Sequence, residues 1–254
     1  MATIWQKRTK YKHYEVRKAG NSTRLYTNGV FHSQYNPNHL VSRGVWDLLF
    51  LPVFFLPAEK LKRVLVLGVG GGAAIQLLNR YVKPEQIIGV ELDAIHLSIA
   101  KRFFKVAGKN IKLVQTDAIK WLASYRGPQF DLIIDDLFFE QEGMGQRAID
   151  LDSSWFSLIE KRLNDHGLLI ANTFSHAELS RSAFCCDLNV AQRFSDAYAF
   201  QLERFDNVVG AFLKETATVG QLRKRLGQTE GLNKKSGADA LKFRVKRLKG
   251  AVAP

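Results

Sequence analysis

The sequence predicts an α/β protein built around a mostly parallel β-sheet, with a small β-hairpin unit before it. Three observations support this fold class. Short apolar segments alternate with amphipathic segments from Leu61 onward, which is the pattern of repeated β–α–β units. The apolar segments are nearly continuous, as in strands buried on both faces of a sheet. A glycine-rich turn joins the first strand to the first helix, and such turns let a ligand approach the helix N-terminus.

The N-terminal sixty residues predict a small β-unit followed by a loop and a short helix. Alternating side chains and an Asn-Gly turn signal at Asn28-Gly29 predict a hairpin unit within residues 10–35. A polar loop comes next. The apolar stretch after it predicts a short helix that ends near Pro52, and we expect this helix to pack the hairpin unit against the main domain.

In the main domain, the sequence pattern predicts five strands and four helices in alternation. The strands are Arg63–Leu67, Gln86–Glu91, Ile111–Gln115, Phe130–Ile134 and Leu168–Thr173, and the helices are Ala73–Tyr81, His96–Phe104, Ala118–Ser124 and Ser153–Arg162. Two further apolar segments flank a turn at Asp206-Asn207, and they predict an antiparallel hairpin at one edge of the sheet.

We expect three parts in the chain, a β-unit (1–60), a ligand-binding domain (61–220) and a basic extension (221–254), and the charge is concentrated at the two ends. The net charge is +13. Residues 1–18 carry six Lys/Arg against one Glu, and residues 221–254 carry ten against two acids, whereas the body between them is neutral. The extension predicts a helix and a loose tail. Basic ends are typical of solvated tails and also of nucleic-acid binding, so both interpretations stay open.

Composition excludes several classes of protein. The longest apolar run, Leu48 to Leu56, is far below the roughly 20 residues that span a bilayer, so we expect no membrane association. The N-terminus has no apolar signal segment, and the only cysteines are the adjacent pair Cys185 and Cys186. These features favour a cytoplasmic protein without disulfides. The histidines show no metal-ligand spacing, so we expect no metal site.

Carboxylates follow the predicted strands at the points where each strand ends. Glu91 ends the second strand, Asp117 follows the third, and Asp135 and Asp136 follow the fourth. Because ligands of open α/β sheets bind at the carboxyl ends of the strands, we expect these side chains to share one site. The alternative is that Glu91 and Asp117 only cap the helices that follow them.

The glycine-rich turn alone does not identify the ligand. Gly68, Gly70 and Ala73 fit the pattern G-x-G-x-x-A, which NAD-dependent oxidoreductases also use. A carboxylate at Glu91 suits a ribose diol in either case. Asp117, followed by the small residue Ala118, is placed to meet an adenine amino group. A pyrophosphate would be repelled by so many carboxylates, whereas a sulfonium cation would tolerate them, so S-adenosylmethionine (AdoMet) is favoured over NAD.

Between about Tyr14 and Lys214 the chain resembles the spermidine synthase-like branch of class I AdoMet-dependent methyltransferases. The segments that carry the likeness are YEVRKAG, TRLYTNGVF, VLVLGVGGG, IIGVELD, LVQTDAIKWL and FDLIIDDLF. The resemblance implies a Rossmann-like, seven-stranded, mostly parallel sheet with an antiparallel C-terminal hairpin. It also implies that Gly68, Gly70, Gly71, Gly72, Glu91, Asp117 and Ala118 bind the donor, AdoMet or decarboxylated AdoMet.

The same resemblance implies a catalytic aspartate at Asp136, with Asp135 as a second candidate that is equally well explained as a helix cap or salt-bridge partner. The chain departs from the family where polyamine synthases place acids. Gly71 replaces the aspartate thought to hold the donor's amino group, and Leu137, Phe138 and Phe139 replace a polar motif. Residues expected to line the acceptor pocket are His32, Gln34, Phe138 and Phe139.

We therefore expect a methyltransferase with a small-molecule acceptor on a spermidine synthase-like scaffold. A polyamine aminopropyltransferase that uses decarboxylated AdoMet is the first alternative. A non-catalytic AdoMet-fold protein that binds nucleic acid through its basic ends is the second. Because related proteins often dimerise, a homodimer is a further expectation.

Overall fold

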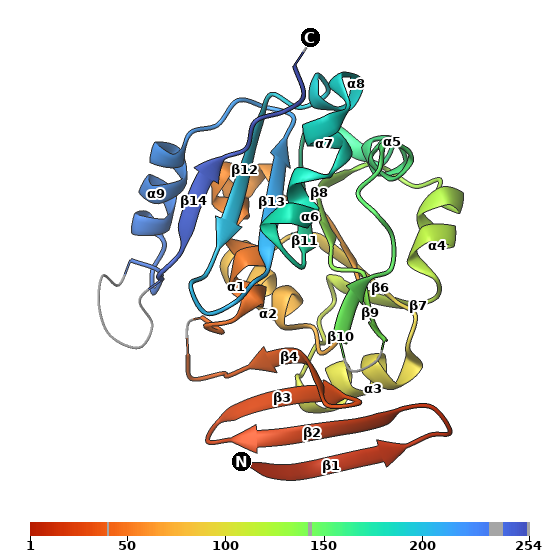
Figure 1. Ribbon diagram of the computed structural model, residues 1–254. Helices are drawn as coiled ribbons and strands as arrows, with labels where there is room; N and C mark the ends of the chain where they lie inside the picture. Colours follow the sequence, from red (N-terminus) through yellow and green to blue (C-terminus); the bar gives the residue numbers. More distant parts are fainter. Residues whose placement is uncertain (40, 142–143, 234–240, 253–254) are drawn as a thin grey trace.

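The computed structural model describes residues 1–39, 41–141, 144–233 and 241–252. A large twisted sheet forms the centre, and a smaller sheet lies across one end of it (Figure 1). The large sheet has the order β14-β12-β13-β11-β8-β5-β6-β7, with β11, β8, β5, β6 and β7 parallel to one another. Its bounds are β5 Arg63–Leu67, β6 Gln86–Glu91, β7 Ile111–Gln115, β8 Phe130–Asp135, β11 Leu163–Thr173, β12 Asp196–Gln201, β13 Val208–Leu213 and β14 Arg244–Arg247.

The predicted α/β class is thus confirmed, with one strand more than the seven expected. The antiparallel hairpin is β12 and β13, and β13 lies between β11 and β12. The added strand β14 pairs with β12 at the edge of the sheet, so part of the C-terminal segment expected to be a loose tail is ordered. Residues 234–240 of that segment lie outside the described residues.

Helices cover both faces of the large sheet because its strands bury apolar side chains on both. One layer holds α1 Val45–Phe50, η1 Leu51–Phe55, α2 Ala73–Tyr81, α3 Ala94–Phe103 and α9 Val219–Gln228. The opposite layer holds α4 Ala118–Ser124, α5 Ser153–Glu160, α6 His176–Ser180, α7 Ala183–Cys186 and α8 Leu188–Ala191. Side chains alternate between the two cores, as Ile133 and Ile134 do on β8. None of the described helices is long and apolar enough to cross a membrane.

The N-terminal unit is a four-stranded antiparallel meander rather than a single hairpin. Its strands are β1 Ala2–Arg8, β2 His13–Ala19, β3 Ser22–Thr27 and β4 Val30–Tyr35, and a short 3₁₀ turn, η2 Ala58–Lys60, precedes the main domain. Tyr14, Val16 and Leu25 bury against the core of the large sheet, which fixes the meander over α2 and α3. As expected, the short apolar helix links the two units, and Pro52 starts its 3₁₀ continuation.

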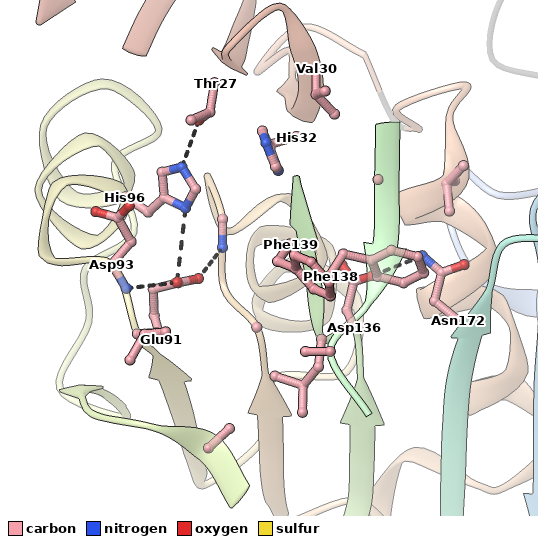
Figure 2. Close-up of a pocket in the computed structure, with 18 of the residues that line it drawn as sticks. Thr27, Val30, His32, Glu91, Asp93, His96, Asp136, Phe138, Phe139 and Asn172 are labelled. Atoms are coloured by element: carbon pink, nitrogen blue, oxygen red, sulfur yellow. Dashed lines mark hydrogen bonds and ion pairs between the residues drawn. The ribbon is translucent and has the colours of Figure 1, made fainter. Parts of the chain in front are cut away.

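A second hairpin lies beside the carboxyl end of β8. It consists of β9 Phe138–Gln141 and β10 Met144–Arg147, which pair antiparallel. The sequence interpretation placed no strands here. The hairpin matters for the site because it carries Phe138 and Phe139 over the strand ends (Figure 2).

Candidate active site

A cavity of about 630 Å³ opens at the carboxyl ends of the parallel strands, beneath β3 and β4 of the meander. Among the described residues, four carboxylates line it, at Glu91, Asp93, Asp117 and Asp136. They come from three strand ends, so the sheet topology gathers side chains that are far apart in sequence (Figure 2). Of the residues expected to form the site, it also brings together Gly68, Gly70, Ala118, His32, Phe138 and Phe139.

The glycine loop crosses the strand ends closely enough that side chains are excluded. Gly68 has φ +84°, and a Cβ there would lie 2.2 Å from the carbonyl oxygen of Asp136. Gly72 has φ +79° and begins α2. These two positions need glycine for conformation and for space. The loop backbone therefore lies directly against the residue that follows β8.

Glu91 binds the glycine loop rather than capping a helix. Its Oε2 accepts hydrogen bonds from the backbone N–H groups of Val69 at 3.0 Å and Gly70 at 2.9 Å. Its Oε1 accepts from the N–H of Asp93 at 2.9 Å. The amides that would cradle a phosphate are thus directed at a carboxylate. This arrangement fits a ligand that offers hydroxyl donors, such as a ribose, and disfavours a pyrophosphate.

Asp117 caps a helix, and its position leaves the ligand-binding role open as well. It is the N-cap of α4, since its Oδ1 accepts from the N–H of Lys120 at 2.9 Å. It also lines the cavity together with Ala118. Capping leaves the second oxygen of Asp117 for other donors, so an exocyclic amine of a purine fits this end of the cavity.

Two polar chains dock the meander onto this end of the site, and the sequence analysis missed both. Asp93 accepts from the Tyr14 hydroxyl at 2.6 Å and from Lys12 Nζ at 2.9 Å. Burial opposes ionisation of Asp93, but these hydrogen bonds outweigh it and lower its pKa to about 2. His96 lies between Thr27, at 2.8 Å, and Glu91, and burial lowers the pKa of its ring. The hydrogen bonds to the meander join residues that are 69 to 81 positions apart, so no local sequence pattern indicates them.

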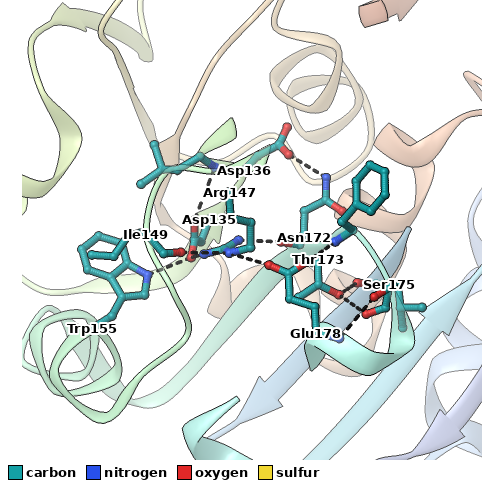
Figure 3. A network of polar contacts seen from close by, with 12 residues as sticks. Asp135, Asp136, Arg147, Ile149, Trp155, Asn172, Thr173, Ser175 and Glu178 are labelled. Carbon is teal, nitrogen blue, oxygen red and sulfur yellow. Dashed lines mark hydrogen bonds and ion pairs between the residues drawn. The ribbon is translucent and has the colours of Figure 1, made fainter. Parts of the chain in front are cut away.

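Asp135 is not part of the cavity. It is fully buried, and its Oδ2 accepts from Arg147 Nη2 at 2.7 Å and from the indole Nε1 of Trp155 at 2.8 Å (Figure 3). The structure therefore gives this residue the salt-bridge role that was one of its two interpretations. Arg147 also donates to the backbone oxygen of Asn172, so the ion pair ties the β9–β10 hairpin to the end of β11.

Asp136 faces the cavity and is held by an amide chain. Its Oδ1 accepts from Asn172 Nδ2 at 2.8 Å, and Asn172 Oδ1 in turn accepts from Asn207 Nδ2 at 3.1 Å. Burial and the neighbouring charge of Asp135 raise the pKa of Asp136 to about 6, against the opposing effect of the Asn172 hydrogen bond. A carboxylate with a pKa near neutrality is suited to accept a proton from a reacting group.

Besides Asp135, three residues expected at the site do not line the cavity. Gln34 accepts from Arg24 Nε and donates to the backbone oxygen of Ser42, both at 2.7 Å. Gly71 and Gly72 do not line the cavity among the described residues. A Cβ at Gly71 would lie 2.6 Å from Ser33 Cβ and 2.8 Å from the ring of Phe104, so these two side chains leave no room for the aspartate of the polyamine synthases.

The family profile of the spermine/spermidine synthase domain matches residues 47–215 of the chain. The chain belongs to this family. The matched part begins in α1 and includes the glycine loop, the carboxylate row and the β12–β13 hairpin, so it contains most of the cavity.

Individual relatives agree with the family. A polyamine aminopropyltransferase 2 of Caldanaerobacter subterraneus subsp. tengcongensis is 24% identical over 128 residues, which is 49% of this chain and 42% of that protein. A polyamine aminopropyltransferase of Clostridium botulinum is 30% identical over 118 residues, or 43% of this chain and 39% of that protein. The chain thus spans about 40% of the length of these curated relatives.

Solved structures show the same fold. A probable spermidine synthase from Corynebacterium glutamicum superimposes with a TM-score of 0.69 at 16% identity, covering 89% of this chain and 87% of that one. At this identity the likeness concerns the fold. It covers a larger share of the chain than the family profile, which matches residues 47–215.

Proposed function

We propose that the protein transfers an aminopropyl group from decarboxylated AdoMet to an amine acceptor, with Asp136 as the general base. The observation that carries the proposal is the charge of the cavity. Four carboxylates line it, whereas the one Lys or Arg among its described lining residues is Lys12, which is paired with Asp93. Decarboxylated AdoMet carries a sulfonium and an ammonium, and no carboxylate. AdoMet adds a carboxylate, for which this cavity offers no unpaired lysine or arginine side chain.

The donor would lie along the β5–β6–β7 half of the cavity. Glu91 would accept hydrogen bonds from the ribose hydroxyls, and Asp117 would accept one from the adenine amino group. The bound donor supplies a carbon bonded to the sulfonium sulfur. An amine can attack this carbon, and the sulfur then leaves as part of a neutral thioether. Asp136, at the adjoining strand β8, would then face the acceptor and the reacting carbon.

The protein's own contribution at the acceptor is proton removal and positioning. Asp136 would take a proton from the acceptor ammonium, and the freed lone pair would form the new N–C bond as the C–S bond breaks. The electron pair of that bond leaves with the thioether, 5′-methylthioadenosine. Asn172 would hold Asp136 in position throughout, since it binds Oδ1. Enzymatic base catalysis of this kind contributes about 10²–10⁴-fold in rate.

The names of the relatives support an aminopropyl group as the group that is transferred. The curated matches described above are named polyamine aminopropyltransferases, which favours aminopropyl transfer over the methyl transfer expected from the sequence. The cavity charge points in the same direction. The two arguments are independent, because one rests on sequence likeness and the other on the side chains of this chain.

Methyl transfer from intact AdoMet is a second candidate, and one observation favours it. The position where polyamine synthases are expected to hold the donor's ammonium is Gly71, and the side chains of Ser33 and Phe104 leave no room there for a carboxylate. Without that partner, selectivity for decarboxylated AdoMet would depend on the general charge of the cavity.

Product analysis separates the two candidates. The protein is incubated with each donor and a panel of primary amines, and the nucleoside product is separated by liquid chromatography. Aminopropyl transfer releases 5′-methylthioadenosine from decarboxylated AdoMet, and methyl transfer releases S-adenosylhomocysteine from AdoMet. Formation of S-adenosylhomocysteine alone would replace the proposed function by the second candidate. The Asp136→Asn variant serves as the control for non-enzymatic breakdown of the donors.

A further inference from the structure

The half of the cavity beyond Asp136 is aromatic. Phe138 and Phe139 follow β8, Phe174 follows β11, and Phe205 precedes β13, and all four line the cavity. These strands are neighbours in the order β13-β11-β8, so the four rings surround one region at the strand ends. Phe139 is 43% exposed and Phe174 is 48% exposed. Large apolar side chains left open to solvent around a pocket mark a surface for an apolar ligand.

The described residues of the same half carry almost no charge. Among the described residues that line the cavity, the carboxylates other than Asp136 follow β6 and β7, at Glu91, Asp93 and Asp117. The polar groups contributed by β11 and by the segment before β13 are the amides of Asn172 and Asn207.

Glu178 is the nearest acid on α6, but it does not line the cavity. Its carboxylate accepts from the N–H of Phe174 at 2.6 Å and lies 3.6 Å from Arg147 Nε. It is therefore already engaged by a backbone donor and a buried arginine. A second ammonium placed among the four rings would lose its water without gaining a carboxylate from any lining residue that the structure describes.

We infer that the acceptor is a primary amine with a single positive charge, carried on an apolar alkyl or aromatic body, rather than a diamine. This inference rests on the proposed function, because it takes the region beyond Asp136 as the acceptor end. One ammonium contacts Asp136, with the faces of the surrounding rings adding cation–π attraction. The apolar body fills the space between Phe139, Phe174 and Phe205.

The test compares two amines of equal length. Hexylamine and cadaverine differ only in the end of the chain, which is a methyl group in one and a second ammonium in the other. Titration calorimetry measures each amine against the full chain saturated with 5′-methylthioadenosine, which fills the donor half. We expect hexylamine to bind at least about tenfold more tightly. Equal affinities, tighter binding of cadaverine, or no binding of either amine at millimolar concentration would overturn the inference.

Two variants at one exposed position make the test specific. Phe174→Asp adds a carboxylate to the apolar half and should shift the preference toward cadaverine by about tenfold or more. Phe174→Leu keeps the site apolar and should leave the preference for hexylamine in place. Because the side chain is 48% exposed, both variants should fold, and circular dichroism checks this. An unchanged preference in Phe174→Asp would contradict the proposal that the far end of the bound amine lies beside position 174.

Turnover distinguishes failure of the inference from failure of the proposed function. If hexylamine binds preferentially but no 5′-methylthioadenosine forms from decarboxylated AdoMet, the proposed function fails and the acceptor class stands. If cadaverine binds more tightly and is converted, the acceptor class fails and aminopropyl transfer stands.

Discussion

Asn172 donates its side-chain amide to Oδ1 of Asp136 at 2.8 Å, and this hydrogen bond opposes the burial that raises the pKa of the carboxyl to about 6. Asp136 follows β8, and Asn172 lies near the end of the neighbouring parallel strand β11. Asn207, from the edge hairpin, donates a hydrogen bond to the side chain of Asn172. The geometry ties the protonation state of the candidate base to an amide chain that crosses three strands.

Asn172→Ala should therefore raise the pKa of Asp136 further. A hydrogen bond to a charged group contributes about 1.5–3 kcal/mol, which corresponds to roughly one to two pKa units. The acidic limb of the pH profile of kcat/KM should move upward from about pH 6 by that amount. Asn207→Ala should give a smaller shift, because Asn207 contacts Asn172 and not Asp136. Superimposable profiles for Asn172→Ala and the unmodified protein would rule out this coupling.

Asp136→Asn should abolish turnover without weakening the fold. We expect kcat to fall by about 10²–10⁴-fold, the usual contribution of a general base. The folded-state pKa of Asp136 is raised, so the fold binds its proton more tightly than the unfolded chain does. Its contribution to stability is largest at low pH and declines between the unfolded value, 3.8, and about 6.

Urea unfolding of both proteins at pH 4 and pH 7.5 checks this sign. The variant lacks the titrating carboxyl, so its stability relative to the unmodified protein should improve as the pH rises. Asp47, whose pKa burial also raises to about 6, is present in both proteins and cancels in the difference. If the variant instead loses stability relative to the unmodified protein as the pH rises, Asp136 has a stabilising partner in its charged form.

Gly68→Ala should disrupt the donor end of the site. The new Cβ would lie 2.2 Å from the carbonyl oxygen of Asp136, and φ at this position is +84°. We expect a loss of about 2 kcal/mol or more in the free energy of unfolding, together with loss of donor binding. Gly227→Ala is the matched control, because it lies in α9 with nothing within 4 Å of the new Cβ. The control should be neutral or stabilising by up to about 1 kcal/mol. Similar effects of the two substitutions would refute the steric argument.

Arg147→Leu should destabilise the protein strongly. Asp135 is fully buried, and the substitution would leave its charge with Trp155 as the remaining side-chain partner described here. Removing one member of a buried ion pair costs about 3–5 kcal/mol. The exposed pair Lys62–Glu85 provides the comparison, and Lys62→Ala should cost about 1 kcal/mol or less. Chemical denaturation of both variants measures the difference, and a loss below about 1 kcal/mol in Arg147→Leu would show that Asp135 is not held as described.

Most of the fold follows from local patterns, and two of the exceptions share a cause. The strands of the parallel sheet are short apolar runs, so their positions are visible in the sequence. Strands β1 and β14 were missed because they lie at sheet edges, are mostly exposed and are rich in basic residues. Such strands lack the alternation that marks a half-buried strand. Whether the basic ends bind nucleic acid, and whether the chain dimerises, stay predictions.

The candidate site could be predicted only in part, because some of its contacts follow from strand order and others do not. Strand ends collect at one edge of a parallel sheet, so Glu91, Asp117 and Asp136 could be grouped from sequence alone. The partners of Asp136 and Asp135 could not be predicted, because Asn172 and Arg147 reach these carboxylates through tertiary contacts. The distinction between Asp135 and Asp136 was available, however. Side chains on a strand alternate, and Asp135 shares the buried face of Ile133.

Titration calorimetry with the two donors tests the central claim most directly. The cavity has four carboxylates, and its one described lysine is already paired, so decarboxylated AdoMet should bind at least about tenfold more tightly than AdoMet. The preference should weaken as ionic strength rises, because it is electrostatic. Tighter binding of AdoMet would contradict the account and would favour methyl transfer.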